Sequence, residues 1–228
     1  MHYVTSDIHG EFDRYQQLLK AIDLHDNDTL YVLGDVIDRG PNGIEIIEDI
    51  MHRPNIIPLL GNHELMCVSA LFPRYNPEAF SLWKDWNGGN TTYRTLKYKR
   101  NATQCNKIFK WIYDLPDHID ITVEGRAFHL VHAFPGNNTE DRVWTRPEYN
   151  APNPFEDGRT VIVGHTVVAH FMGDQSLQDA VKSLEVQHEH MEIVHAPGFI
   201  AIDCGCGNRT SARRLACLRL EDFKEYYI

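Results

Sequence analysis

The first 63 residues alternate between short β-prone runs and amphipathic helical stretches, and this alternation constrains the fold more than any other feature. The β-prone runs lie at 3–5, 29–33 and 55–60, and apolar residues recur at helical spacing in the two stretches between them. Strands that alternate with helices pair in parallel through right-handed crossovers. The sequence therefore predicts an α/β fold that begins β-α-β-α-β.

The rest of the chain predicts one helical region and several more strands. Residues 65–117 contain tryptophans and apolar positions at helical spacing, so we expect a mainly helical insertion there. The polar, proline-rich stretch 137–158 is expected to be a loop. No repeat or linker is evident, so residues 1–228 are expected to form a single domain. Further strands are expected at 120–123, 126–131, 160–163, 191–194, 199–202 and 215–220.

Charge and composition exclude several classes of function. The formal net charge of the 228 residues is −10, which argues against general binding of nucleic acid or of an anionic membrane surface. One stretch departs from this balance, because residues 84–110 hold seven lysines and arginines against Asp85 alone. Two explanations fit this stretch equally well: a solvated helical face, or a role in attracting anionic phosphosubstrates.

Cysteine content and hydropathy predict a cytoplasmic location. The five cysteines are odd in number and dispersed, as is usual for reduced thiols. No apolar run approaches the roughly 20 residues that span a bilayer, and the N-terminus has no signal-peptide pattern.

Metal-ligand residue types follow five of the expected strands. They are Asp7 and His9, then Asp35, Asn62, His132 and His165. In α/β sheets the ligand site lies beyond the carboxyl ends of the strands, so these side chains are expected to converge. The set offers nitrogen and oxygen without thiolate, which suits manganese, iron or zinc in a reactive site.

The motifs that carry these residues resemble those of a known family. Asp7-Ile8-His9, Gly34-Asp35-Val36-Ile37-Asp38-Arg39-Gly40 and Gly61-Asn62-His63-Glu64 are similar to the three signature motifs of the calcineurin-like metallophosphoesterases. They look most like the phosphoprotein phosphatase branch, in particular the bacterial and lambda-type serine/threonine protein phosphatases. Later matches are His132, Gly164-His165, Val143-Trp144-Thr145-Arg146 and Asp203-Cys204-Gly205-Cys206-Gly207. The resemblance implies a two-sheet β-sandwich flanked by helices, in four α/β/β/α layers.

The resemblance also implies a centre of two divalent metal ions, with manganese expected and iron or zinc as alternatives. Asp35 would bridge the two ions, and a bridging hydroxide would attack phosphorus in line. The ligands implied for the two ions are Asp7, His9, Asp35, Asn62, His132 and His165.

Four further residues receive roles from the resemblance. His63 would be the general acid, and Asp38 would pair with it and fix its tautomer. Arg39 and Arg146, with Asn62, would bind the substrate phosphate. The implied substrate is a phosphorylated protein or peptide.

Two alternative functions stay open at this point. A symmetrical diadenosine tetraphosphate hydrolase is a close relative, but that group usually has a non-acidic residue at the position of Asp38 and Asp at that of Glu64. A non-catalytic phospho-ligand binding module is the other alternative, although every expected ligand position is filled. His188-Glu189-His190 is interpreted as a solvated strand edge, and Cys204 and Cys206 as ordinary thiols.

Overall fold

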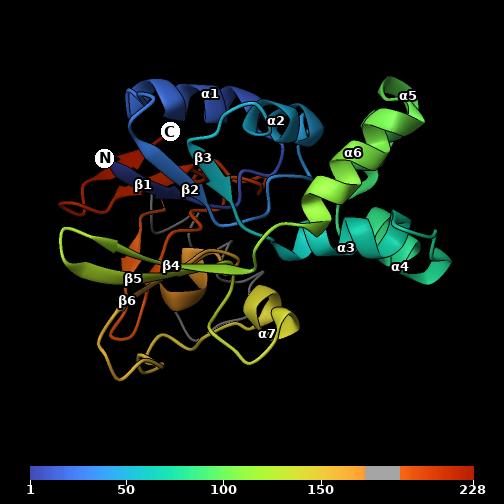
Figure 1. Ribbon diagram of the computed structural model, residues 1–228. Helices are drawn as coiled ribbons and strands as arrows, with labels where there is room; N and C mark the ends of the chain where they lie inside the picture. The colour runs from blue at the N-terminus through green and yellow to red at the C-terminus, as the bar shows by residue number, and fades with distance from the viewer. Residues whose placement is uncertain (173–190) are drawn as a thin grey trace.

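The computed structural model describes residues 1–172 and 191–228, and it places two five-stranded sheets face to face (Figure 1). The first sheet has the order β10-β9-β1-β2-β3, and the second has the order β4-β5-β6-β8-β7. Both sheets are mixed, and helices flank the pair. The predicted fold class, a β-sandwich flanked by helices, is confirmed.

The first sheet is built on the predicted parallel strands. β1 (His2–Thr5), β2 (Thr29–Val32) and β3 (Ile56–Pro58) pair in parallel, and β9 (Ala216–Arg219) lies antiparallel to β1. β10 (Glu225–Tyr227) completes the sheet beside β9 and was not predicted.

Alternating side chains bury this sheet on both faces. Leu30 and Val32 of β2 point toward helices α1 (Phe12–Ala21) and α2 (Gly43–Ile50), and Tyr31 between them faces the second sheet. Strands buried on both faces read as continuous apolar runs, which is why the sequence pattern identified them.

The second sheet begins with the predicted hairpin, β4 (His118–Val123) and β5 (Arg126–Val131). β6 (Thr160–Val163) runs parallel to β5 and to β8 (Ile200–Ala201), and β7 (Val194–His195) lies antiparallel to β8. Phe128, Leu130 and Ile162 lie on one face of this sheet and pack against the first sheet in the apolar layer between the two sheets. Strands β7 and β8 are shorter than their apolar runs.

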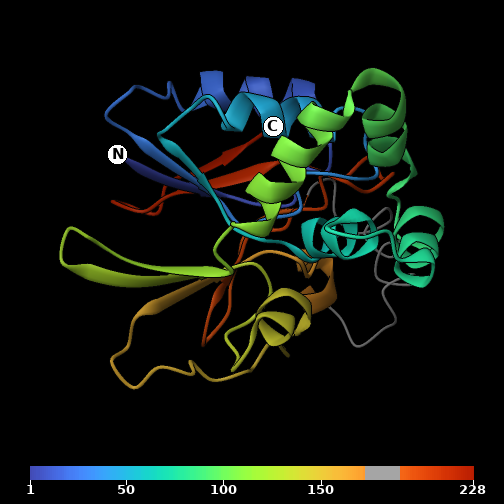
Figure 2. The ribbon, with the colours of Figure 1, turned by 45° about the vertical axis from the view of Figure 1, so that its right-hand side comes forward.

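Helices α3 to α6 lie together beside the two sheets (Figure 2). Helix formation starts inside the third motif, at Asn62, a few residues before the predicted boundary at 65. The elements are α3 (Asn62–Leu71), α4 (Pro77–Ser81), a π-helix (Leu82–Trp86), α5 (Asn90–Lys99) and α6 (Ala102–Tyr113).

The prediction of a loop throughout 137–158 was wrong in its first part, because α7 (Thr139–Trp144) forms there. Asn138 caps this helix by accepting a hydrogen bond from the Asp141 backbone N–H at 2.9 Å. A 3₁₀ helix covers Val168–Met172. The His188-Glu189-His190 stretch lies outside the described residues. Within the described residues, no helix combines the length and apolar character needed to cross a membrane.

Candidate metal centre and catalytic site

The loops that follow the strands hold the candidate residues in left-handed backbone conformations. Of the nine non-glycine residues with positive φ in the described part of the chain, six belong to this site, and their φ values lie between 48° and 69°. Such conformations typically cost about 1–3 kcal/mol each and cluster where a structure orients functional groups. The six residues are Asp7, His9, Asp35, Asp38, Arg39 and His165.

The Glu64 carboxylate holds the loop after β2 in place. One oxygen accepts hydrogen bonds from the backbone N–H groups of Asp35 and Gly61, at 2.8 and 3.2 Å. The other accepts from Val36 and Ile37, at 2.9 and 3.1 Å. An aspartate is one methylene shorter, so a glutamate at this position reaches all four donors from the start of α3.

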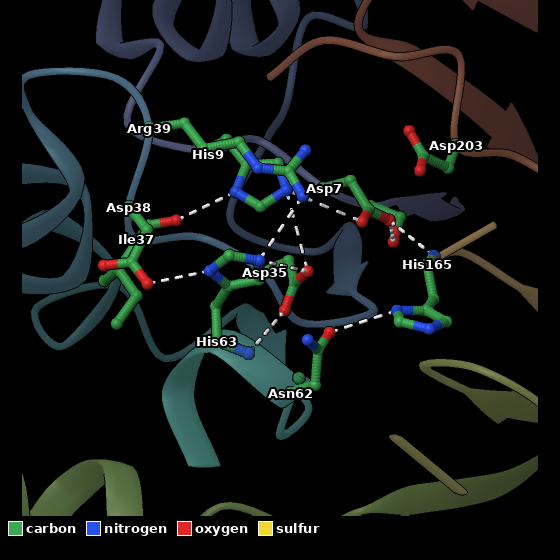
Figure 3. A network of polar contacts seen from close by, with 12 residues as sticks. Asp7, His9, Asp35, Ile37, Asp38, Arg39, Asn62, His63, His165 and Asp203 are labelled. Carbon is green, nitrogen blue, oxygen red and sulfur yellow. Dashed lines mark hydrogen bonds and ion pairs between the residues drawn. The ribbon is translucent and has the colours of Figure 1, made fainter. Parts of the chain in front are cut away.

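Asp35 lies at the centre of the site, and two groups of donor atoms share it (Figure 3). On one side, His9 Nε2 lies 3.6 Å from Asp35 Oδ2, and Asp7 Oδ1 lies 3.9 Å from the same histidine nitrogen. His63 Nε2 also faces this side, 3.8 Å from Asp35 Oδ2. The predicted first set, Asp7, His9 and Asp35, is therefore brought together, with His63 beside it.

The second group lies on the opposite side of the Asp35 carboxylate. His132 Nε2 is 3.4 Å from Asp35 Oδ1. Asn62 Oδ1 lies 3.0 Å from His132 Nε2 and 3.0 Å from His165 Nδ1. The structure thus brings together the predicted second set as well, and every member is buried.

Backbone carbonyls fix which histidine nitrogen faces the centre. His9 Nδ1 lies 3.0 Å from the Ile37 carbonyl and His132 Nδ1 lies 2.6 Å from that of Leu33, so each Nδ1 carries the proton that it donates. Each Nε2 then presents a lone pair toward oxygen lone pairs. This is the arrangement of metal-bound histidines, whose other nitrogen is held by a carbonyl or carboxylate.

The donors fit divalent metal ions. Burial, together with the Arg39 charge, holds the pKa of His9 well below its usual value, and burial beside His132 lowers the pKa of His165 to about 2. Both imidazoles are therefore neutral, which is the form that binds metal. Buried lone pairs that face one another repel unless a cation lies between them, and the His165 Nε2 atom has no hydrogen-bond partner within the described residues.

His63 differs from the other histidines, because a carboxylate holds its Nδ1. Asp38 Oδ2 lies 2.7 Å from His63 Nδ1, and both side chains are buried. Burial by itself lowers the pKa of His63, but the charges of Asp35 and Asp38 outweigh burial and raise it above the usual value. The same site therefore contains histidines suited to hold metal and one suited to carry a proton.

Trp83 completes this pair from the helical region. Its indole N–H donates a hydrogen bond to Asp38 Oδ2 at 2.7 Å, and its side chain is fully buried. Thr92 accepts from the backbone N–H of Asp38 at 3.0 Å. Sequence reasoning assigned Trp83 only to the core of the insertion, and no local signal links it to a residue 45 positions earlier.

The two predicted phosphate-binding arginines lie on different sides of the centre. Arg39 Nη2 is 3.4 Å from His63 Nε2, and its backbone N–H donates to the Gly88 carbonyl at 3.1 Å. Arg146 donates to the His165 carbonyl at 3.3 Å and is otherwise exposed. Both guanidinium groups therefore border the two donor groups.

The basic segment 84–110 is partly neutralised by acidic neighbours. Arg100 lies 2.5 Å from Glu48 and 3.6 Å from Glu45, and Lys99 lies 3.6 Å from Glu45. Lys84 pairs with Asp85 at 2.6 Å. Much of the segment's charge thus stabilises local packing, which weakens its predicted role in attracting substrate.

Comparison with known proteins places this site in a family. The sequence profile described as calcineurin-like phosphoesterase matches residues 3–196. The chain belongs to this family. Membership confirms the resemblance seen in the motifs.

Similar members of the calcineurin-like family have different substrates in their names. A symmetrical bis(5'-nucleosyl)-tetraphosphatase of Chromobacterium violaceum is 29% identical over 135 residues, which cover 58% of this chain and 42% of the relative. Serine/threonine-protein phosphatase 2 of Escherichia coli is 27% identical over 137 residues, or 59% of each chain. The matches thus span less than two thirds of either relative.

Solved structures of the family share the fold. A metallophosphoesterase from Sphaerobacter thermophilus has a TM-score of 0.59 at 18% identity and covers 100% of this chain and 87% of its own. A protein serine/threonine phosphatase from Saccharomyces cerevisiae has a TM-score of 0.58 at 15% identity, with coverage of 95% and 71%.

Proposed function

We propose that this protein is a serine/threonine phosphoprotein phosphatase that uses two divalent metal ions, with manganese as the expected metal. The buried pair of Asp38 and His63 is the observation that carries the proposal. A serine or threonine alkoxide is a strongly basic leaving group and needs a proton, whereas a nucleotide phosphate leaves as a stable anion. A carboxylate-supported general acid therefore suits a phosphomonoester of an alcohol better than a phosphoanhydride.

We propose the following roles for residues of this chain in binding the two metal ions. Asp7, His9 and Asp35 would hold one ion, and Asp35 with Asn62, His132 and His165 would hold the other. The ions, when bound, would supply Lewis acidity and lower the pKa of water.

The remaining roles concern the phosphate and the proton. Arg39 and Arg146 would orient the phosphate oxygens, and Asn62 would also contact them. His63 would donate its Nε2 proton to the departing alkoxide, and Asp38 would keep the proton on Nδ1 and stabilise the imidazolium. We further propose a cytoplasmic location, which is supported by five cysteines that are all free thiols among the described residues.

A symmetrical diadenosine tetraphosphatase is the second candidate, because several similar curated proteins carry that name. Glu64 and Asp38 argue against it. The Glu64 carboxylate holds the loop after β2, and Asp38 orients His63. A shorter residue at position 64 or a non-acidic residue at position 38 would not make these contacts.

A side-by-side substrate panel tests the proposal. We expect the manganese-loaded protein to hydrolyse a phosphoserine peptide at least about tenfold faster, in kcat/KM, than diadenosine tetraphosphate, because the general acid is matched to an alkoxide. Stripping metal with a chelator should abolish both activities, and Mn²⁺ should restore them. A preference for the dinucleotide would favour the second candidate, and no hydrolysis of any substrate across a metal screen would favour a binding module.

Trp83→Phe should reduce activity by loosening Asp38. Removing the indole N–H leaves one hydrogen bond fewer on the carboxylate that orients His63, so we expect kcat for phosphoserine peptide to fall about tenfold, the kinetic equivalent of one charge-assisted hydrogen bond. Hydrolysis of p-nitrophenyl phosphate, whose leaving group needs little protonation, should fall much less. Trp86→Phe is the matched control, because Trp86 is 81% exposed and three residues away. An equal loss of kcat on both substrates would indicate that Trp83 contributes only packing and does not orient Asp38.

A further inference from the structure

A cavity of about 480 Å³ lies directly beside the candidate catalytic site. Arg39 forms their common wall, because its Nη2 lies 3.4 Å from His63 Nε2 and its Nη1 donates to Asn208 Oδ1 at 3.4 Å. The side chains of Glu11, Arg39, Asn90, Asn208, Arg209 and Arg213 line the cavity.

Close backbone approaches fix the walls of this cavity. A Cβ on Gly207 would lie 2.4 Å from His9 Cδ2, so the loop that carries the two later arginines is held against His9, a candidate metal ligand. A Cβ on Gly88 would lie 3.1 Å from Arg39 Cγ, and Gly88 adopts a φ of +83°. A side chain at position 207 would displace His9, and one at position 88 would crowd Arg39 and be strained by the positive φ, so both loops pack directly against residues of the site.

The charge of the lining is positive in a chain of net charge −10. The lining contains three arginines and a single glutamate, Glu11, and Arg213 pairs with Glu11 at 3.1 Å. Arg213 also donates to the carbonyls of Cys206 and Asn208, at 3.3 and 3.2 Å, which fixes its guanidinium. Arg209 is exposed and has no ion pair across residues 1–172 and 191–228. The cavity therefore offers, next to Arg39, at least one guanidinium that no carboxylate of the described residues pairs with.

We propose that this cavity is a second anion subsite, which binds an acidic side chain adjacent to the phosphorylated residue of a peptide substrate. The proposal rests on the proposed phosphatase function, because it extends the substrate beyond the scissile phosphate. Arg39 binds the phosphate and borders the cavity, so the neighbouring peptide residue enters it. Arg209 then meets a carboxylate, and Asn90 and Asn208 supply amide donors.

Two phosphoserine peptides that differ only at the flanking positions test this subsite. One carries Glu on each side of the phosphoserine and the other carries Gln. At low salt we expect KM for the Glu peptide to be about three- to tenfold lower, a typical size for one or two partly exposed charge pairs, and to converge with that of the Gln peptide at high salt. In Arg209→Gln the ratio of the two KM values should fall close to one.

Arg74→Gln is the matched control. It removes an exposed arginine from the loop after α3, which does not line the cavity, so the KM ratio should stay at the wild-type value. A wild-type ratio of one, or an Arg209→Gln variant that keeps the preference, overturns the subsite.

A binding measurement separates failure of the subsite from failure of the proposed function. The His63→Asn variant, loaded with Mn²⁺, is titrated with each fluorescent peptide, and the double variant His63→Asn/Arg209→Gln is titrated in the same way. Tighter binding of the Glu peptide that disappears in the double variant supports the subsite even if wild type hydrolyses no phosphopeptide. Equal affinities of the two peptides for the His63→Asn variant overturn it.

Discussion

Replacing Asp35 by asparagine is expected to reduce kcat/KM by about a thousandfold or more, because this carboxylate lies between the two groups of candidate metal ligands. Its two oxygens face His9 and His132, at 3.6 and 3.4 Å. An amide has no charge to offset two dications, and its NH₂ group would point a donor at one of them. Elemental analysis should find two manganese ions in the wild type and fewer in the variant.

Thermal unfolding distinguishes lost metal from lost fold. Metal that binds only the native state raises its stability by mass action, so Mn²⁺ should raise the melting temperature of the wild type and have much less effect on Asp35→Asn. The metal-free variant should still unfold cooperatively. Asp120→Asn is a suitable control, since Asp120 pairs with His129 and Arg159 on the second sheet. An Asp35→Asn variant that keeps both ions and a tenth of the activity would contradict the central position of this residue.

The sequence was informative wherever the chemistry depends on neighbours along the chain. The strands at 3–5, 29–33 and 160–163 are continuous apolar runs that end at functional residues, and the structure forms strands at each. Parallel pairing places the ends of β1 and β2 side by side in the first sheet and those of β5 and β6 in the second. The packing of the two sheets then brings these ends together, which is why all six predicted metal ligands meet around Asp35. Their roles as ligands stay a prediction until metal is measured.

Contacts between distant segments were not predictable in the same way. Trp83 reaches Asp38 from a π-helix, whose register no periodicity rule anticipates, and a tryptophan at that position reads equally well as core. The strand at Glu225–Tyr227 is only three residues long, and its pairing with β9 defines it. The helix at Thr139–Trp144 did carry a local signal, the Asn138 cap, but the prolines that follow obscured it.

The location of an anion-binding site was also not predictable from the density of positive charge along the sequence. The sequence directs attention to residues 84–110, where cations are dense, yet Lys99 and Arg100 are paired with Glu45 and Glu48 on α2. The cavity beside Arg39 draws its charge from Arg209 and Arg213, which the sequence analysis did not single out. Local density of charge thus says less about an anion site than the positions of the counter-charges do.

Replacing His63 by asparagine should impair hydrolysis most for substrates with basic leaving groups. General acid catalysis typically contributes about a hundredfold to ten-thousandfold, so we expect a loss of that size in kcat for phosphoserine peptide. For p-nitrophenyl phosphate the leaving group departs without a proton, and the loss should be about tenfold or less. A series of aryl phosphates would show this as a steeper dependence of log kcat on leaving-group pKa in the variant than in the wild type.

The same series separates a proton donor from a metal ligand at His63. Its Nε2 lies 3.8 Å from Asp35 Oδ2, near enough to the first donor group that a ligand role is geometrically open. A ligand role predicts loss of one manganese ion and equal slowing of good and poor leaving groups. A proton-donor role predicts an unchanged metal content and unequal slowing. Asp38→Asn should resemble His63→Asn in the leaving-group series at a smaller amplitude, because it removes the carboxylate that keeps the proton on Nδ1 and leaves the imidazole in place.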